Sequence, residues 1–281
     1  MVILIVVIFI SFQMADHGSQ KREQMIKEIR PSEFNMNTKK FHQNLSKLMK
    51  SEKEKVEVVI VLLSGSFNPV HSGHVDVLEL SKKFLEEKHK KQVVCGYLAP
   101  SSDSYVKGKL KEFAMPLTHR NQMCREASKH SDWIDVCEFG MASASKTLEI
   151  VKTILQNEVP PNVKIIGCEL FGADHAAKYA LWRRVGEQIC VCTPREPHTQ
   201  QVRENLKSMK DQNANSRVLL LEPPDNYQLK SVSSTAIRDA MMKSKGLKEF
   251  VGIGHMDADV VSYIEKMGQK LFFETKKKQK D

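Results

Sequence analysis

A chain of 281 residues, with 41% hydrophobic and 27% charged side chains, is long enough for one large α/β domain or two small ones and has the composition of an ordinary globular protein. The net charge of +9 favours anionic partners such as nucleotides. No basic run is interleaved with aromatic residues, which argues against a dedicated nucleic-acid-binding surface. None of the six cysteines lies in a CxxC pair or at zinc-binding spacing, so we expect reduced, buried thiols and an intracellular protein, in the cytoplasm, the nucleus or both.

Residues 1–55 are predicted to be an extension in front of the folded domain. The apolar segment at 2–12 is shorter than the roughly 20 residues that a membrane-spanning helix needs, and it lacks the basic start and cleavage site of a secretory signal. We interpret it as a weak anchor or as an artefact of start-codon choice, and we expect no stable membrane insertion. The polar, lysine-rich remainder is expected to be largely disordered, with short helices near 26–29 and 41–49.

From Val56 onward, apolar runs alternate with helical patterns. The runs that predict strands are 56–63, 92–99, 133–139, 163–171, 188–192 and 217–221. The patterns that predict helices are 75–88, 118–129 with Thr118 as N-cap, 145–155, 176–182, 200–209, 233–244 and 257–267, whereas 100–117 is expected to be a loop. This alternation predicts an α/β fold with a parallel sheet in one domain, 56–270, followed by a basic tail, 271–281. Ligands are expected at the carboxyl ends of the strands.

The most informative stretch follows the first predicted strand. An apolar run ends at Leu63, a glycine turn follows at Gly65, and two histidines, His71 and His74, stand where a helical pattern begins. The free N–H groups of a helix start bind anions, and residues three apart share one face of its first turn. Gly65 and Gly73 let the backbone approach a ligand closely. The string predicts a polyphosphate site; a core turn with two surface histidines is the alternative.

A second anion-binding pattern is VSSTAIR at 232–238. Ser233 or Ser234 is the expected N-cap of the helix that follows. Hydroxyl and N–H groups at that start, with Arg238 one turn later, would hold a polyphosphate tail. An ordinary serine cap explains this segment equally well when it is taken alone. Its pairing with the first pattern favours the phosphate site.

Together the two patterns resemble those of the HxGH nucleotidylyltransferase superfamily. The longer strings, GSFNPVHSGH and SSTAIR, are similar to those of the nicotinamide/nicotinate mononucleotide adenylyltransferases of eukaryotic type. Further matches are a Y-x-K at 105–107, a P-x-x-H-R at 116–120, G-A-D at 172–174 and L-W at 181–182. The resemblance implies a Rossmann-like nucleotidylyltransferase fold with helices on both faces of the sheet. It also implies transfer of AMP from ATP to the mononucleotide, which gives NAD or its deamido form and pyrophosphate.

The resemblance also implies a set of site residues. Catalytic roles fall to His71, His74, Lys107 and Arg238. ATP would be bound by Gly65, Ser66, Phe67, His74, Ser233, Ser234, Thr235, Ala236, Ile237 and Arg238. The mononucleotide would be bound by Ser66, Phe67, Lys107, Thr147, Gly172, Asp174, Leu181, Trp182 and Arg195. Mg²⁺ or another divalent cation would accompany ATP and need few protein ligands, so no metal-binding side chain is predicted.

The base-recognition half of the site departs from the family. Ala144 stands where the family has a tryptophan, with Phe139 as the candidate replacement, and Glu169 is the alternative to Asp174. For Trp182, the alternative to binding the mononucleotide is an ordinary position in the hydrophobic core. Two other functions stay open: an HxGH enzyme with a different acceptor, and a non-catalytic nucleotide-binding relative that acts as a scaffold or chaperone. The sequence fixes neither the choice between nicotinamide and nicotinate nor the formation of a homo-oligomer.

Overall fold

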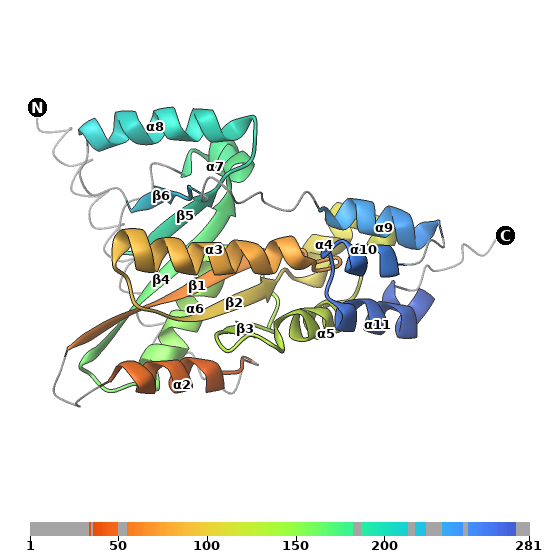
Figure 1. Ribbon diagram of the computed structural model, residues 1–281, viewed down its shortest axis with the longest axis horizontal. Coiled ribbons are helices and arrows are strands. Elements are labelled where there is room, and N and C mark those ends of the chain that lie inside the picture. Colours follow the sequence, from red (N-terminus) through yellow and green to blue (C-terminus); the bar gives the residue numbers. More distant parts are fainter. Residues whose placement is uncertain are drawn as a thin grey trace, which may run out of the picture.

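Six parallel strands form one sheet at the centre of the protein (Figure 1). The computed structural model describes residues 34, 36–49, 55–181, 187–212, 217–222, 232–243 and 247–273. In spatial order the strands are β3 (Ile134–Val136), β2 (Val93–Pro100), β1 (Val56–Gly65), β4 (Val163–Gly172), β5 (Ile189–Thr193) and β6 (Val218–Leu220). The predicted α/β fold with a parallel sheet is confirmed. The edge strand β3 is shorter than the predicted run 133–139.

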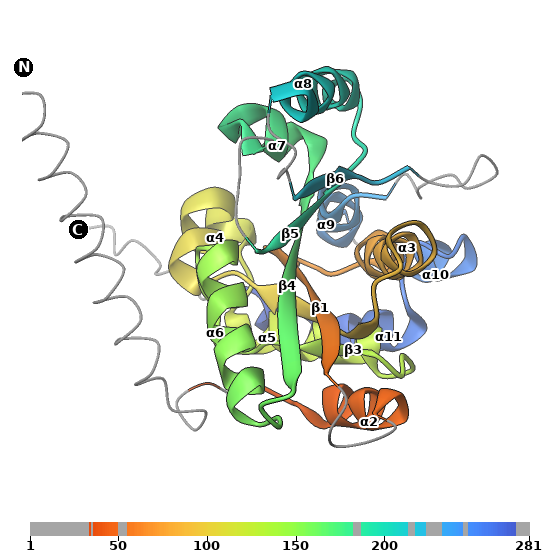
Figure 2. The ribbon, with the colours of Figure 1, turned by 90° about the vertical axis from the view of Figure 1, so that its left-hand side faces the viewer.

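Helices cover both faces of the sheet, as predicted; Figure 2 shows α3 and α6 on opposite sides of β1 and β4. One face packs against α3 (Ser72–His89), α5 (Leu117–Ser128), α9 (Ser234–Met242) and α11 (Ala258–Met267). The other face packs against α2 (Lys39–Leu48) and α6 (Ala144–Asn157). A third apolar cluster joins β5 and β6 to α7 (Ala173–Tyr179) and α8 (His198–Gln212). The remaining described helices are α4 (Asp103–Leu110), η2 (Lys111–Phe113), α10 (Lys248–Gly252) and η4 (Gly268–Leu271).

The strand register brings several loops to one edge of the sheet. Leu63 of β1 pairs with Leu98 of β2 and with Leu170 of β4. The chain leaves β1 toward β2 on one side, whereas β4 lies on its other side, so the strand order reverses at β1. Ligands of open parallel sheets bind in the crevice at such a reversal. The turn after β1 therefore lies where a ligand site is expected.

The prediction of a loop at 100–117 is wrong, because α4 and η2 occupy most of it. Val106 is the only buried residue of α4, so this helix has no apolar period that a sequence pattern could reveal. The helix predicted from Thr118 begins at Leu117, and Pro116 rather than Thr118 occupies the N-cap position. Proline is tolerated there because the first N–H groups of a helix have no partner within it.

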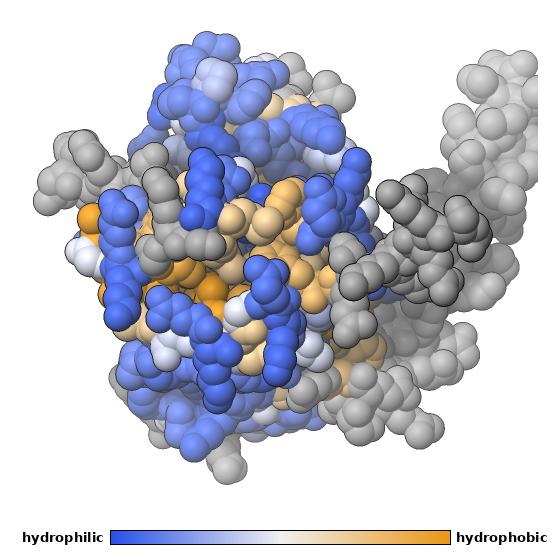
Figure 3. Space-filling model, turned by 90° about the vertical axis from the view of Figure 1, so that its right-hand side faces the viewer, coloured by the Kyte–Doolittle hydropathy of each residue, from blue (hydrophilic) through white to orange (hydrophobic). Residues whose placement is uncertain are grey.

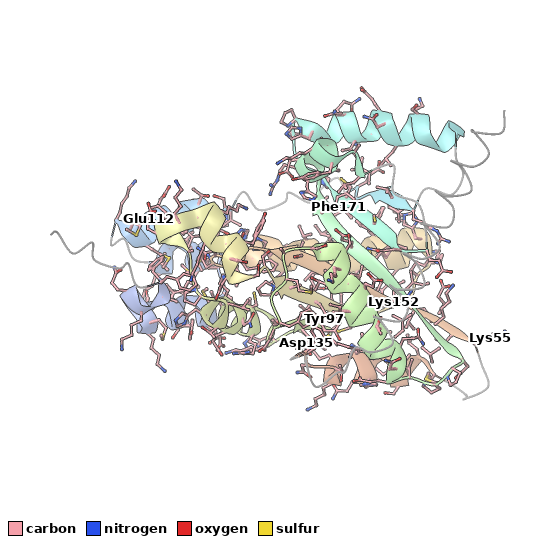
Figure 4. The ribbon with its side chains drawn as sticks, turned by 180° about the vertical axis from the view of Figure 1, so that it is seen from behind. Lys55, Tyr97, Glu112, Asp135, Lys152 and Phe171 are labelled. Atoms are coloured by element: carbon pink, nitrogen blue, oxygen red, sulfur yellow. The ribbon has the colours of Figure 1, made fainter. Side chains whose placement is uncertain are left out.

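The predicted extension contributes a packed helix. The helix expected near 41–49 is α2, and Phe41 and Leu45 on it are buried. Lys40 Nζ donates to the carbonyls of Ser128 (3.1 Å) and Ile134 (2.5 Å). Figure 4 labels Tyr97 and Asp135, which are paired residues of β2 and β3. Burial raises the pKa of the Asp135 carboxyl, while the charge of Lys40 acts in the opposite direction.

Loss of the Asn44 amide is expected to weaken the attachment of α2. Asn44 Nδ2 donates to the carbonyls of Val94 (3.1 Å) and Asp132 (3.0 Å). Asn44→Ala should lower the free energy of unfolding by about 1–2 kcal/mol, because both hydrogen bonds to these carbonyls are lost, together with an exposed one from Lys47 Nζ to Asn44 Oδ1. Urea denaturation measures the change, with the exposed neighbour variant Gln43→Ala as a control. Equal stability of the two variants would contradict this role.

All six cysteines are buried thiols, as predicted. No helix in the described part of the chain is both long and apolar enough to cross a bilayer. The apolar segment 2–12 lies outside the described residues.

Candidate functional site

The turn after β1 folds tightly around its own phenylalanine. A Cβ atom on Gly65 would lie 3.2 Å from the Phe67 ring, so a side chain here would press on that ring. Phe67 is buried and has a φ of 43°, in the left-handed region. The Gly65 carbonyl accepts a hydrogen bond from Ser101 N–H (2.8 Å), just after β2. The turn is thus fixed by the neighbouring strand.

The two histidines stack at the first turn of α3. His71 occupies the N-cap position, and its backbone N–H donates to Nδ1 of His74 (3.2 Å). The ring centroids of His71 and His74 lie 3.7 Å apart, and the Phe67 ring meets His74 edge-on. Because Nδ1 of His74 accepts a hydrogen bond, the proton of the neutral ring lies on Nε2. Nε2–H is then the donor that His74 offers to a ligand.

Burial keeps both imidazoles neutral. It lowers the pKa of His71 from 6.5 to about 4, and the charges of His255 and Arg195 add to the effect. Burial also holds the pKa of His74 well below its ordinary value, and His71 adds to this. Ser66 Oγ and His71 Nδ1 are buried without a hydrogen-bond partner among the described residues. These atoms can therefore bind a ligand that brings its own donors, acceptors and negative charge.

The depressed pKa of His71 predicts a pH-dependent stability. The unfolded chain binds this proton below about pH 6.5, whereas the folded chain binds it only near pH 4, so the free energy of unfolding should fall as the pH decreases across that window. His71→Gln should make the fall shallower, because one of the two buried imidazoles is removed. Urea denaturation between pH 4 and 7 measures both slopes. Identical slopes would refute the assignment.

The serine–arginine pattern at 232–238 contacts the turn that precedes the two histidines. Ser234 Oγ donates to the carbonyl of Pro69 (2.9 Å), and Arg238 Nη1 donates to the carbonyl of Asn68 (2.8 Å). A Cβ atom on Gly73 would lie 3.3 Å from Val232 Cγ1. These two bonds join residues that are 165 and 170 positions apart in the chain. The structure thus brings the two motifs together.

The other predicted ATP-binding residues of α9 have different environments. Ser233 caps the helix by accepting from Ala236 N–H (3.2 Å), and Thr235 Oγ1 accepts from Arg238 Nη2 (3.1 Å). Thr235 and Ala236 are exposed, whereas Ile237 is fully buried in the core. Ile237 is therefore not exposed to a ligand in this structure.

Several residues predicted to bind the mononucleotide face the core instead. Thr147 is buried and donates to the carbonyl of Ser143 within its own helix (2.8 Å). Leu181 is also buried. Phe139, the candidate replacement for the missing aromatic, is half-buried and packs edge-on against Phe34. Trp182 lies outside the described residues.

Asp174 and Arg195 lie together beyond the ends of β4 and β5. Arg195 Nη1 donates to Asp174 Oδ2 (3.2 Å), and both side chains are exposed. A Cβ atom on Gly172 would lie 2.5 Å from Asp174 Oδ1, so a side chain there would displace the Asp174 carboxylate. Gly172 follows Phe171, which Figure 4 labels near the end of β4.

Glu169, the alternative to Asp174, has another environment. It lies within β4 beside Leu62 of β1 and is 3% exposed. Its Oε2 accepts from Ser145 Oγ (2.8 Å) and from Gln188 Nε2 (3.2 Å). Its carboxylate is thus held inside the fold, whereas Asp174 lies at the carboxyl edge of the sheet. The geometry favours Asp174 as the ligand-facing carboxylate.

Lys107, the predicted phosphate clamp, projects from α4. Its side chain is exposed, and Nζ lies 3.6 Å from the centroid of the Phe273 ring. No group of three or more histidine, cysteine or acidic side chains in the described ranges could hold a metal ion.

Arg120, which was not predicted as a site residue, connects the turn after β1 to the two helices that follow β2. Arg120 is fully buried and donates to the carbonyls of Met115 (2.9 Å) and Ser66 (3.1 Å) and to Asp103 Oδ1 (3.0 Å). It therefore joins the turn after β1 to the starts of α4 and α5. Asn68 adds a second link, because its side chain bonds to residues 113 and 115. The P-x-x-H-R string at 116–120 was the available signal for Arg120.

A groove of about 330 Å³ lies between α9 and α10. Its lining residues are Ala236, Asp239, Ala240, Lys243, Glu249, Phe250 and Ile253. Figure 3 faces this end of the molecule and shows apolar residues ringed by hydrophilic ones. Of the predicted site residues, only Ala236 lines this groove.

Proteins similar to this chain include nicotinamide/nicotinic acid mononucleotide adenylyltransferases. A nicotinamide/nicotinic acid mononucleotide adenylyltransferase 2 from Danio rerio is 40% identical over 78 residues, which is 28% of this chain and 24% of that relative. The matched part thus spans about a quarter of that protein. A nicotinamide/nicotinic acid mononucleotide adenylyltransferase from Arabidopsis thaliana is 28% identical over 224 residues, which is 74% of this chain and 90% of that protein.

A solved structure shares the fold. It is Plasmodium falciparum nicotinic acid mononucleotide adenylyltransferase complexed with NaAD, with a TM-score of 0.51 and 16% identity over 77% of this chain and 100% of that one. The family model described as cytidylyltransferase-like matches residues 62–240, from β1 through most of α9. This range includes the histidine pair and the serine–arginine motif. The chain belongs to the cytidylyltransferase-like family.

Proposed function

We propose that this protein transfers AMP from ATP to nicotinamide or nicotinate mononucleotide, giving NAD or its deamido form and pyrophosphate. The proposal is supported by the names of the relatives from Danio rerio and Arabidopsis thaliana. The observation that carries it is the stacked, neutral histidine pair at the start of α3, closed by Ser234 and Arg238 of α9. This arrangement suits a phosphate chain, because it combines a helix start, imidazole N–H donors and a guanidinium.

The proposed reaction exchanges one bond at the α-phosphorus of ATP. An oxygen of the mononucleotide phosphate forms a bond to that phosphorus, and the bond to the bridging oxygen of pyrophosphate breaks. Such a transfer needs positioning and charge stabilisation more than covalent help. His71 and His74 would donate hydrogen bonds to the oxygens on which charge develops. Because both rings are neutral before ATP binds, they add donors without a fixed charge.

The other residues would hold the two substrates. Arg238 and the hydroxyls at 233–235 would contact the β- and γ-phosphates, and Lys107 would contact the mononucleotide phosphate. Asp174 and Arg195 would face the nucleoside at the ends of β4 and β5. A divalent cation, Mg²⁺ or another, would enter bound to ATP as part of the substrate, since Mg²⁺ keeps several waters and binds phosphate oxygens directly.

A coupled assay tests the proposal directly. The purified full chain is incubated with ATP, Mg²⁺ and either mononucleotide, and the amounts of dinucleotide and pyrophosphate are measured. The two products should form in equal amounts. We expect product with at least one of the two acceptors. Pyrophosphate release only with an unrelated phosphate acceptor would favour a different HxGH enzyme. ATP binding without turnover would favour a non-catalytic relative.

A further inference from the structure

The last described residues pack against the helix that carries Lys107. Leu271 is fully buried, and Phe272 packs against the largest apolar cluster. The backbone N–H of Phe273 donates to the carbonyl of Ala114 (3.3 Å), which fixes Phe273 just beyond η2. Figure 1 shows α4, α5 and α11 gathered at the same end of the molecule. The first residues of the predicted basic tail are therefore packed onto this end.

The ammonium of Lys107 lies over the face of the Phe273 ring, with 3.6 Å between Nζ and the ring centroid. A lysine ammonium is attracted to the negative face of an aromatic ring. Asp103, the one acidic residue of α4, stands four positions before Lys107, a spacing at which opposite charges can pair on a helix. Asp103 Oδ1 is already engaged by Arg120 (3.0 Å) and by the N–H of Leu117 (2.7 Å). The ring thus replaces the carboxylate as the partner of Lys107.

The helix that carries Lys107 is linked to the turn after β1. Ser101, two residues before α4, pairs with Gly65, and Arg120 connects Asp103 to the carbonyl of Ser66. Lys107 is one helical turn from Asp103. An ammonium has three N–H donors, so a ring on one side leaves donors free for a phosphate oxygen. A lysine that is already held in place loses less side-chain freedom when it binds a ligand.

We propose that Phe273 is a positioning residue for Lys107, whose ring holds the ammonium at the rim of the site in the orientation that receives the mononucleotide phosphate. This inference rests on the proposed function. Residues 271–273 thereby contribute to the site, whereas the sequence predicts that they belong to a basic tail.

The test is a calorimetric titration of the full chain with nicotinamide or nicotinate mononucleotide. Phe273→Leu should weaken binding of the mononucleotide by about two- to five-fold, the range of an exposed cation–π contact, and should raise its KM with little change in kcat. Phe273→Tyr keeps a ring and should retain the affinity. Phe272→Leu is the matched control, because it removes the neighbouring ring, which packs on the core. Its affinity should equal that of the wild type.

A double-mutant comparison separates positioning from a structural role. In a Lys107→Met background, the further change Phe273→Leu should leave the affinity unaltered, because the ring no longer has an ammonium to hold. Equal weakening in both backgrounds would overturn the proposal, as would wild-type affinity in Phe273→Leu. If Phe273→Leu unfolds, Phe273→Met keeps the apolar volume and is judged by the same two outcomes.

The titration also distinguishes this inference from the proposed function. A wild-type chain that binds a mononucleotide but forms no dinucleotide would overturn the proposed reaction, and the affinity comparison would still decide the role of Phe273. A wild-type chain that binds neither mononucleotide would overturn both.

Discussion

His74→Ala is expected to lower kcat by about 10²- to 10³-fold, the usual effect of removing one donor that stabilises developing charge. The Nδ1 atom of His74 is occupied by the backbone N–H of His71 (3.2 Å), so Nε2–H is the group directed at a substrate. Burial keeps the ring neutral by lowering its pKa, and the donor is thus in place before charge develops. Steady-state rates with ATP and the preferred mononucleotide measure the loss.

The control for this variant is a histidine far from the predicted site residues. His130 is 76% exposed and contacts Asp259 at 3.4 Å, so His130→Ala should leave kcat unchanged. His74→Ala should cost about 1–3 kcal/mol of stability, because the His71 N–H loses its acceptor and the ring contacts with His71 and Phe67 are removed. A folded His74→Ala protein that keeps the wild-type kcat would show that this ring does not act on the reacting phosphates.

Arg120→Met is expected to lower the free energy of unfolding by about 1–3 kcal/mol, the range for leaving buried hydrogen-bond acceptors without their donor. The guanidinium is fully buried and forms three hydrogen bonds, two of them to backbone carbonyls. Methionine fills much of the space but leaves these carbonyls without their donor. Urea denaturation followed by circular dichroism measures the change.

Arg125 on the same helix provides the matched control. Its side chain is 44% exposed and pairs with Glu138 at the surface, so Arg125→Met should cost less than about 1 kcal/mol. Arg120→Met should also weaken ATP binding in the remaining folded protein, because Ser66 loses the bond that fixes its carbonyl. Similar stability of the two variants would contradict the central position of Arg120.

Local patterns were sufficient for the sheet and for the phosphate half of the site. Buried parallel strands appear as continuous apolar runs, and β1 and β4 are such runs. The histidines lie within four residues of one another, so their position on one helix turn follows from the helix repeat. By contrast, α4 buries one residue only, and its helical state depends on contacts that no local period reveals.

The sequence by itself determined the parallel α/β fold and the position of the two histidines at the helix start after β1, because both depend on short-range order. Only the tertiary structure decided the contacts and the burial of the predicted site residues. It placed Arg238 against the carbonyl of Asn68, turned Ile237 and Thr147 toward the core, and set Asp174 rather than Glu169 at the edge of the sheet. The direction of each side chain depends on partners up to 170 residues away. Tertiary packing likewise lowers the pKa of His71 and of His74, chiefly through burial and in addition through nearby charged groups such as Arg195.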